Sequence, residues 1–240
     1  MTPRPHARTR RAAVSLVLMS AGILTLAGCD PRTLIYFLQP NEPMIPAPES
    51  APKLEGKRVA VVTHASAGAQ GELPSLERDL AREFSQRLKT NVKKIDLVPQ
   101  QKVWDWVDGH PNWTNPAEIA HAHEADYVIF LEIESFKSQE AGDLNVLNAS
   151  ARVHIQAVEL KHPTNSRGRA LTDQPKEEEA VYDDFMETTF PKRGPMPLDS
   201  GVSKSKFKKQ FLRVVAVECT WHFVPHAPED AIGDANTNGR

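Results

Sequence analysis

Residues 127–133 read YVIFLEI, a run of β-branched, aromatic and aliphatic side chains broken by a single acid. A second run of the same kind, RVAVVT, occupies residues 58–63. Continuous apolar runs of this length are typical of strands that are covered on both faces, as in a sheet flanked by helices. We therefore predict that both runs are strands in the sheet of an α/β domain.

Helices are predicted between and after these two strands. Residues 73–88 carry apolar side chains at spacings of three and four with charged residues between them, which indicates an amphipathic helix. A helix that begins at Asn115 has an asparagine cap, a proline in its first turn and a glutamate at the capping-box position. Residues 99–108 are predicted to form a short helix, and the apolar positions between 207 and 219 a last one.

The other segments complete the predicted fold. Residues 92–98 are a second strand, and residues 146–160 alternate apolar and polar side chains, as a half-exposed antiparallel strand does. Residues 161–200 are polar, acidic and marked by prolines, which predicts that they are mostly loop. The prediction is a single α/β domain at residues 57–224, with a three- to five-stranded mixed sheet covered by helices in the order β-α-β-α-α-β-β-α.

The amino-terminal residues 1–28 contain the three parts of a signal peptide in order. The basic part contains Arg4, Arg8, Arg10 and Arg11 and no acid. Residues 12–26 are an apolar run that is shorter than the roughly 20 residues needed to span a bilayer. The sequence LAGC then occupies residues 26–29 and resembles the lipobox of bacterial lipoproteins. The resemblance implies cleavage before Cys29 and lipid attached to that residue.

The lipobox resemblance also implies a cellular location for the mature chain. Two or three acyl chains hold a protein far better than one, so the lipid on Cys29 would anchor the chain to a membrane of the bacterial envelope, facing the periplasm. The sequence does not distinguish between the inner and the outer membrane as the site of this anchor. Residues 29–56 are predicted to be a tether, and five prolines between positions 40 and 52 predict that this stretch is semi-rigid and spans roughly 40 Å at about 3.1 Å per residue. Residues 225–240 are predicted to be a disordered tail.

Charge and cysteine content exclude further possibilities. Loss of residues 1–28 removes four arginines and no acid, so the formal charge changes from −2 to about −6. Such a charge disfavours nucleic acid as a partner. Cys219 is the other cysteine of the chain, so no intramolecular disulfide is available once Cys29 carries lipid. The position of Cys219 on the apolar stripe of the last helix predicts a buried, unreactive thiol.

Few residue patterns indicate a catalytic, ligand-binding or metal-binding site. The segment from His64 to Gly71 (HASAGAQG) follows a strand and precedes a helix, where α/β proteins often bind ligands. It matches neither G-x-G-x-x-G nor the P-loop, so a plain connection is favoured. His121 and His123 are two apart on a predicted helix, and their imidazoles diverge too far to share a metal ion. We therefore expect no catalytic, cofactor-binding or metal-binding residues.

Two groups of residues are candidates for a partner surface. Two tryptophans that are two positions apart on a predicted helix point to nearly opposite sides, so one of them is expected to be exposed as an interface anchor. Lysines in the first turn of the last helix interact unfavourably with the helix dipole, so a purely structural role does not explain their position. The alternatives are a cover for the sheet edge and a solvated helix face. The two groups are Trp104, Trp106 and Trp113, and Lys206, Lys208 and Lys209.

The domain also resembles a group of known proteins. KRVAVVT at residues 57–63 and EADYVIFLEIESF at residues 124–136 make the region up to about residue 160 similar to envelope lipoproteins. The group includes the curli-secretion lipoprotein, the lipoprotein activators of peptidoglycan synthases and the amino-terminal domain of the Tol-system propeller protein. The resemblance implies a non-enzymatic protein that binds an envelope protein or assembles with itself. The alternative is an envelope hydrolase or small-ligand-binding protein that uses residues 64–71.

Overall fold

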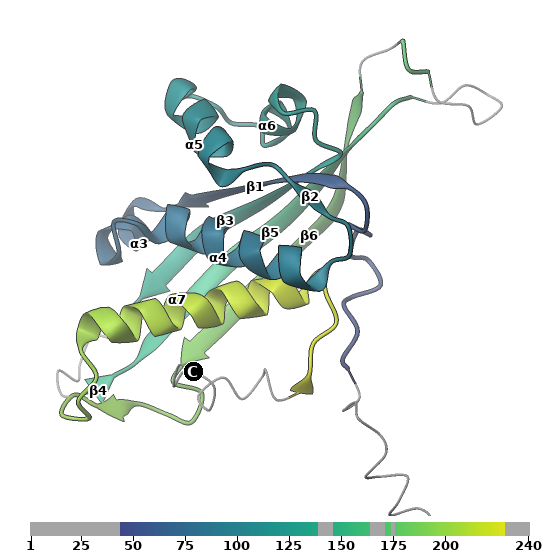
Figure 1. The fold of residues 1–240 in the computed structure, drawn as a ribbon. Helices are drawn as coiled ribbons and strands as arrows, with labels where there is room; N and C mark the ends of the chain where they lie inside the picture. Colours follow the sequence, from purple (N-terminus) through teal and green to yellow (C-terminus); the bar gives the residue numbers. More distant parts are fainter. Residues whose placement is uncertain (1–43, 139–145, 164–170, 174–175, 229–240) are drawn as a thin grey trace, which may run out of the picture. The chain divides into compact units, whose positions relative to one another are not determined.

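The two apolar runs form the parallel centre of a five-stranded sheet in a computed structural model of the chain, which describes residues 44–138, 146–163, 171–173 and 176–228 (Figure 1). Strand β1 (Arg58–Ala65) pairs in parallel with β3 (Tyr127–Lys137), and Val59 lies opposite Tyr127. The strand order is β2-β1-β3-β5-β6. The predicted class is confirmed: a single α/β domain with a mixed sheet packed against helices.

The outer strands differ in length from the prediction. Strand β2 (Asp96–Leu97) pairs in parallel with β1 and is much shorter than the predicted segment 92–98. Strand β5 (Ala149–Lys161) runs antiparallel to β3, as its alternating pattern predicted. Two short strands, β4 (Val146–Leu147) and β7 (Met196–Pro197), form a separate two-stranded sheet.

The loop prediction for residues 161–200 was wrong for its central part. Strand β6 (Glu177–Phe190) lies there and pairs antiparallel with β5 at the edge of the sheet. Only one face of β6 packs against the domain, so buried side chains occur at every second position from Tyr182 to Phe190 with one exception, Asp184. The positions between them are exposed and include Asp183 and Glu187, and the strand begins with the exposed acids Glu177, Glu178 and Glu179. That composition is typical of a loop. It made the alternation of buried and exposed residues difficult to recognise in the sequence.

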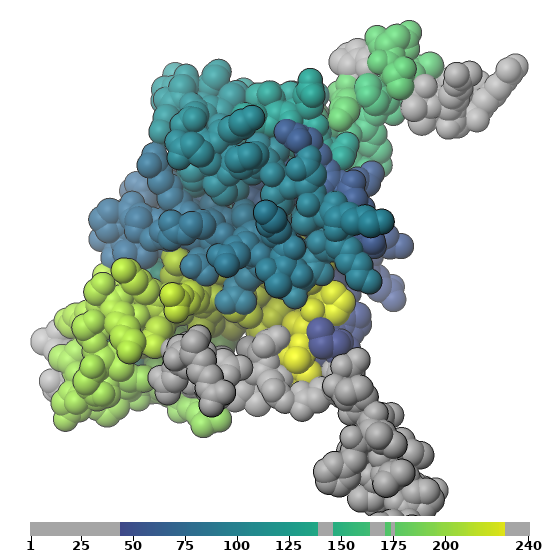
Figure 2. All heavy atoms as spheres, viewed as in Figure 1, coloured from purple at the N-terminus to yellow at the C-terminus, as the bar shows by residue number. Residues whose placement is uncertain are grey.

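One face of the sheet is covered completely by helices. Helices α4 (Leu76–Asn91) and α7 (Lys204–Trp221) pack against each other and against this face, with the short α3 (Ala67–Glu72) beside them. Figure 1 shows α4 and α7 running side by side across the sheet, and Figure 2 shows the same face filled by their side chains. The main hydrophobic core lies here, and its largest fully buried side chains include Phe84, Phe136, Phe190, Phe207 and Phe211.

The other face of the sheet is covered at one end only. Helices α5 (Gln100–Gly109) and α6 (Ala117–Ala122) pack there over a smaller core that includes Val62 of β1 and Val128 of β3. The predicted cap of α6 is present, because the Asn115 side-chain oxygen accepts a hydrogen bond from the Ala117 amide at 3.0 Å. The remaining part of this face carries no helix among the described residues.

The ordered domain extends beyond residues 57–224 at both ends. Leu54, within the segment expected to be tether, is 3% exposed and belongs to the main core. Ile45 and His226 form a β-bridge, with N–O distances of 2.8 and 3.0 Å. The signal peptide, Cys29, residues 30–43 of the tether and residues 229–240 of the tail lie outside the described residues. Within the described part, no helix is long and apolar enough to cross a membrane.

Candidate functional site

The outward side chains of β3 and β5 change from apolar to polar or charged where the cover by helices α5 and α6 ends. Along β5, Leu160 lies in the smaller core and Val158 packs against it, whereas the outward positions that precede them in the strand, Gln156, His154 and Arg152, are polar. The same change occurs on β3 after Phe130. We call the uncovered area the open sheet face. It comprises Glu132 and Glu134 of β3, Arg152, His154 and Gln156 of β5, and Asp183, Phe185 and Glu187 of β6.

Phe185 is the aromatic centre of the open sheet face. Its side chain is 42% exposed, which is unusual for a phenylalanine in the middle of a strand. The ring stacks on the imidazole of His154, with centroids 4.4 Å apart and planes at 11°. The guanidinium of Arg152 lies 4.5 Å from the ring centroid. The ring is therefore held in one orientation while much of it faces solvent.

The groups that hold Phe185 are themselves fixed by carboxylates. Arg152 donates to Glu134 at 2.8 Å and to Glu187 at 2.9 Å, and so links β3 to β6 across its own strand. The Nε2 atom of His154 lies 2.8 Å from Asp183, which also accepts a hydrogen bond from Gln156 at 3.1 Å. Charge-assisted hydrogen bonds of this kind orient both partners.

The open sheet face is acidic. Four carboxylates face one arginine and one histidine, so the acids are in excess even when the imidazole is charged. Burial alone would lower the pKa of His154, but hydrogen bonds to Asp183 and Glu132 outweigh burial and raise it. The hydrogen bond to His154 correspondingly lowers the pKa of the Asp183 carboxyl. Both groups thus favour their charged forms beside Phe185.

A second histidine cluster lies on the helix side of β6. The hydroxyl of Tyr182 is 2.7 Å from Nδ1 of His222 and 3.2 Å from the Asp184 carboxylate. Burial lowers the pKa of His222, although Asp184 opposes this effect. Burial and Asp184 both raise the pKa of the Tyr182 phenol. The phenol therefore stays protonated, and the cluster joins the end of α7 to the edge strand.

Residues 64–71 do not form the loop that was expected. Strand β1 continues to Ala65, and Ser66 caps helix α3, where its Oγ accepts from the Ala69 amide at 3.4 Å. The Ala65 amide donates to the Glu77 carboxylate at 2.7 Å. The amides of Ala65, Ser66 and Ala69 therefore already have partners within the chain.

Trp104 and Trp106 lie on different sides of helix α5, and Trp113 follows that helix. Trp104 is 7% exposed and lies in the main core, with the Arg78 guanidinium 5.6 Å from its ring. Trp106 is half-buried and stacks on His110 at 4.2 Å. Trp113 is also half-buried and meets the ring of Phe130 edge-on at 5.8 Å. The structure thus packs all three rings against the domain to different degrees.

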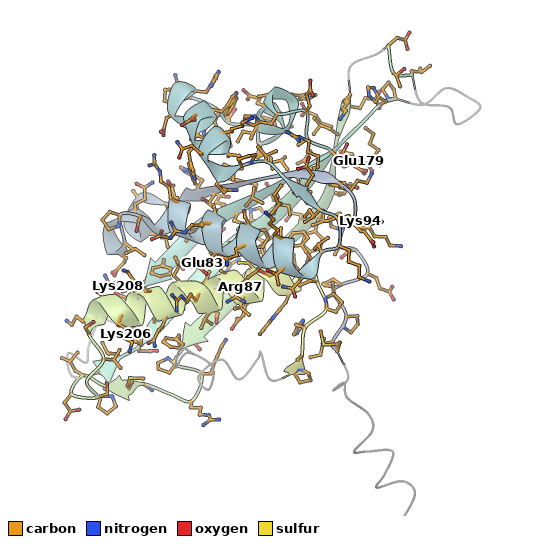
Figure 3. The ribbon with its side chains drawn as sticks, viewed as in Figure 1. Glu83, Arg87, Lys94, Glu179, Lys206 and Lys208 are labelled. Carbon is orange, nitrogen blue, oxygen red and sulfur yellow. The ribbon has the colours of Figure 1, made fainter. Side chains whose placement is uncertain are left out.

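The lysines of the last helix lie at its amino-terminal end, as Figure 3 shows for Lys206 and Lys208. Lys208 is held by Glu72 of α3, with distances of 3.0 Å to the carboxylate and 2.6 Å to the carbonyl oxygen. A hydrogen bond from Ser138, together with Lys208, lowers the pKa of the Glu72 carboxyl. Lys206 and Lys209 are exposed.

The remaining residues considered from the sequence are dispersed. His121 lies 3.2 Å from Glu178 of β6, and the described residues contain no group of three or more side chains arranged to hold a metal ion. Cys219 is fully buried in the main core, and burial raises the pKa of its thiol. This thiol is therefore neutral and inaccessible at physiological pH.

Sequence reasoning did not find the open sheet face. Its residues come from three separate strands, and the β6 residues lie in a segment predicted to be loop. The available signal was the alternation of Arg152, His154 and Gln156 with buried residues on β5, which showed that this strand has one polar side.

Comparisons with known proteins give likenesses in structure only. No protein-family model matches the chain, and no curated protein matches it in sequence. The lipoprotein GNA1162 from Neisseria meningitidis is 10% identical, with a TM-score of 0.37 over 66% of this chain and 94% of that chain. The PelC dodecamer from Paraburkholderia phytofirmans is 12% identical, with a TM-score of 0.36 over 75% of this chain and 96% of that one.

The LpoB C-terminal domain from Salmonella enterica is a further similar structure, 12% identical with a TM-score of 0.31, over 56% of this chain and 83% of that chain. Bacterial lipoproteins are thus among the structures that this chain resembles. At such identities and scores, the likeness does not transfer a function from those proteins to this chain.

Proposed function

We propose that this chain is a non-catalytic, lipid-anchored protein of the bacterial cell envelope that binds another envelope protein through the open sheet face. The lipid would be carried by Cys29, and residues 30–43 would link the membrane to the domain. The support for this anchor is the order of a basic stretch, a short apolar run and the sequence LAGC at residues 26–29.

The observation that carries the binding proposal is the exposed, immobilised ring of Phe185. Aromatic residues that are fixed before binding lose little conformational entropy on association, and such residues dominate many interfaces. The carboxylates around the ring would form the polar rim of such an interface, where they would affect association rate and partner choice.

The alternative, a hydrolase or small-ligand-binding protein that uses residues 64–71, has less support. The amides of Ala65 and Ala69 are hydrogen-bonded within the chain. The thiol of Cys219 is buried in the core and the phenol of Tyr182 is held protonated, so neither is poised as a nucleophile.

The experiment is affinity capture of the tagged full-length chain from chemically cross-linked cells, with three variants. We expect Cys29→Ser to prevent lipid attachment and to leave an unprocessed or mislocalised chain. We expect Phe185→Ala to remain at the membrane but to lose the protein that is captured with the wild type. Leu198→Ala, which truncates another exposed apolar side chain, is the matched control and should capture that protein normally.

Two results would count against the proposal. If Cys29→Ser still partitions with membranes after cleavage at the normal site, lipidation at Cys29 is wrong. If Phe185→Ala and Leu198→Ala capture the same proteins in the same amounts as the wild type, the open sheet face is not the binding surface.

A further inference from the structure

Strand β6 is the last strand of the sheet, and no described strand pairs with its outer edge. An edge strand presents a row of backbone amide and carbonyl groups that can pair with a further strand. At fourteen residues, β6 is far longer than the usual β-strand of roughly five or six residues. A long free edge beside a candidate binding surface can itself take part in recognition.

The regular part of this edge lies beside the open sheet face. Ala157 of β5 pairs with Tyr182 and Val158 pairs with Ala180, so Val181 is an extra residue in a β-bulge. From Tyr182 to Phe190 the register is continuous. A bulge interrupts pairing at a sheet edge, so the part of the edge suited to pairing is the stretch from Tyr182 onward, which includes Phe185.

The charge of β6 decides what kind of strand could pair with it. The strand contains six acids and no basic residue: Glu177, Glu178, Glu179, Asp183, Asp184 and Glu187. Pairing with β6 of a second copy would place two such acidic strands side by side, and like charges on neighbouring strands are destabilising. A strand with lysine or arginine side chains would instead form favourable cross-strand pairs.

We propose that β6 accepts an extended basic segment of the partner protein as a sixth strand of the sheet. This inference rests on the proposed function and specifies the partner of the same site. Recognition of an extended peptide at a sheet edge uses backbone hydrogen bonds for affinity and alternate side chains for specificity.

The alternation of side chains on β6 predicts the pattern of that segment. Asp183 and Glu187 are 60% and 66% exposed on the open sheet face, and Phe185 lies between them. Side chains of an added strand would lie beside these residues at every second position. A matching segment therefore has basic residues that face the two acids and an apolar or aromatic residue that faces the ring.

Three synthetic peptides test this proposal on the full-length chain, purified from membranes in a non-ionic detergent. The first peptide repeats lysine–threonine–valine–threonine over about ten residues, so that lysine and valine alternate along one face of the added strand. The second replaces each lysine by glutamate, and the third replaces each valine by proline, which keeps the charge but removes the amide donors that strand pairing requires. We expect the first peptide to bind about 10-fold or more tightly than either of the others, measured by fluorescence anisotropy.

Hydrogen–deuterium exchange locates the binding. Saturating basic peptide should slow amide exchange within residues 182–190 and leave the exchange of helix α4 unchanged. The variant Glu187→Lys, which reverses one charge on the open sheet face, should weaken binding by about 10-fold. Glu83→Lys is the matched charge control, because Glu83 lies on α4 (Figure 3). A thermal melt of each variant checks that the domain is folded.

Several results would overturn the inference. Equal binding of the lysine–valine and lysine–proline peptides would show attraction by charge without strand pairing. Protection outside β6, or an equal effect of the Glu83→Lys control, would place the peptide elsewhere. Protection of β6 that grows with protein concentration in the absence of peptide would show that a second copy occupies the edge. Any of these results, combined with Phe185-dependent capture of a partner, would refute strand addition and leave the proposed function intact.

Discussion

Truncation of Phe185 to alanine separates a binding role from a structural one. Phe→Ala in a closed core costs about 3–5 kcal/mol of unfolding free energy, because a cavity remains. Phe185 is 42% exposed, and its removal opens no closed cavity. What is lost is the stacking on His154 and the contact with Arg152, at about 0.5–1 kcal/mol each. We therefore expect Phe185→Ala to lower the unfolding free energy by about 1–2 kcal/mol.

The assay for this prediction is urea unfolding at 25 °C, with Phe211→Ala as the comparison. Phe211 is fully buried in the main core, so its truncation should cost the full 3–5 kcal/mol or so. The effect of Phe185→Ala on partner binding should be larger than its effect on stability. Loss of an interface anchor typically costs about 2 kcal/mol or more, which is about 30-fold in the dissociation constant for the captured partner.

Two outcomes would refute this reasoning. If Phe185→Ala destabilises the domain as much as Phe211→Ala, the ring is part of the core and its exposure has no functional meaning. If the variant keeps the wild-type dissociation constant for the captured partner, the ring is not an anchor.

Three further predictions follow from single side chains. Trp104→Ala should lower the unfolding free energy by about 3–5 kcal/mol, whereas Trp106→Ala should cost about 1 kcal/mol; equal losses in urea unfolding would contradict their placement. His154 has a raised pKa, so its contribution to stability is present below pH 6.5 and is lost as the pH rises through that pKa. His222 has a lowered pKa, so stability is lost as the pH falls below 6.5, because the unfolded chain binds the proton first. Urea unfolding across this pH range should therefore show opposite pH trends when His154→Gln and His222→Gln are each compared with the wild type. Cys219 should resist thiol reagents in the native protein, and rapid labelling would contradict its burial.

The centre of the fold was predictable because its signals are local and redundant. Residues 59–62 of β1 and 127–131 of β3 are covered on both faces, so these stretches are continuously apolar. Helix α4 is amphipathic over four turns, and its stripe was visible in the spacing of its leucines. In each of these elements, the spacing of apolar residues within one short segment is enough to indicate which side chains are buried.

The edge of the domain was not predictable in the same way. Strand β6 buries one side only, and the acids on its other side gave it the composition of a loop. Leu54 belongs to the core although it follows the proline-rich segment, because its neighbours in space come from distant parts of the chain. The extent of a domain depends on such long-range contacts.

The open sheet face depends on an arrangement that a sequence does not state. The polar side of β5 was visible in the alternation that contains Arg152 and His154. Whether that side faces water or a helix depends on how far α5 and α6 reach across the sheet. The contact of Phe185 with both residues depends on the pairing register of β5 and β6.

The most direct test of the proposed function is site-specific photo-cross-linking in living cells. A photoreactive amino acid is placed at position 185 of the full-length chain, and at position 83 on α4 as the control. The account predicts a discrete cross-linked product at position 185 that joins this chain to another envelope protein and is absent at position 83. No product at position 185, the same product at both positions, or a product that contains only two copies of this chain would contradict it.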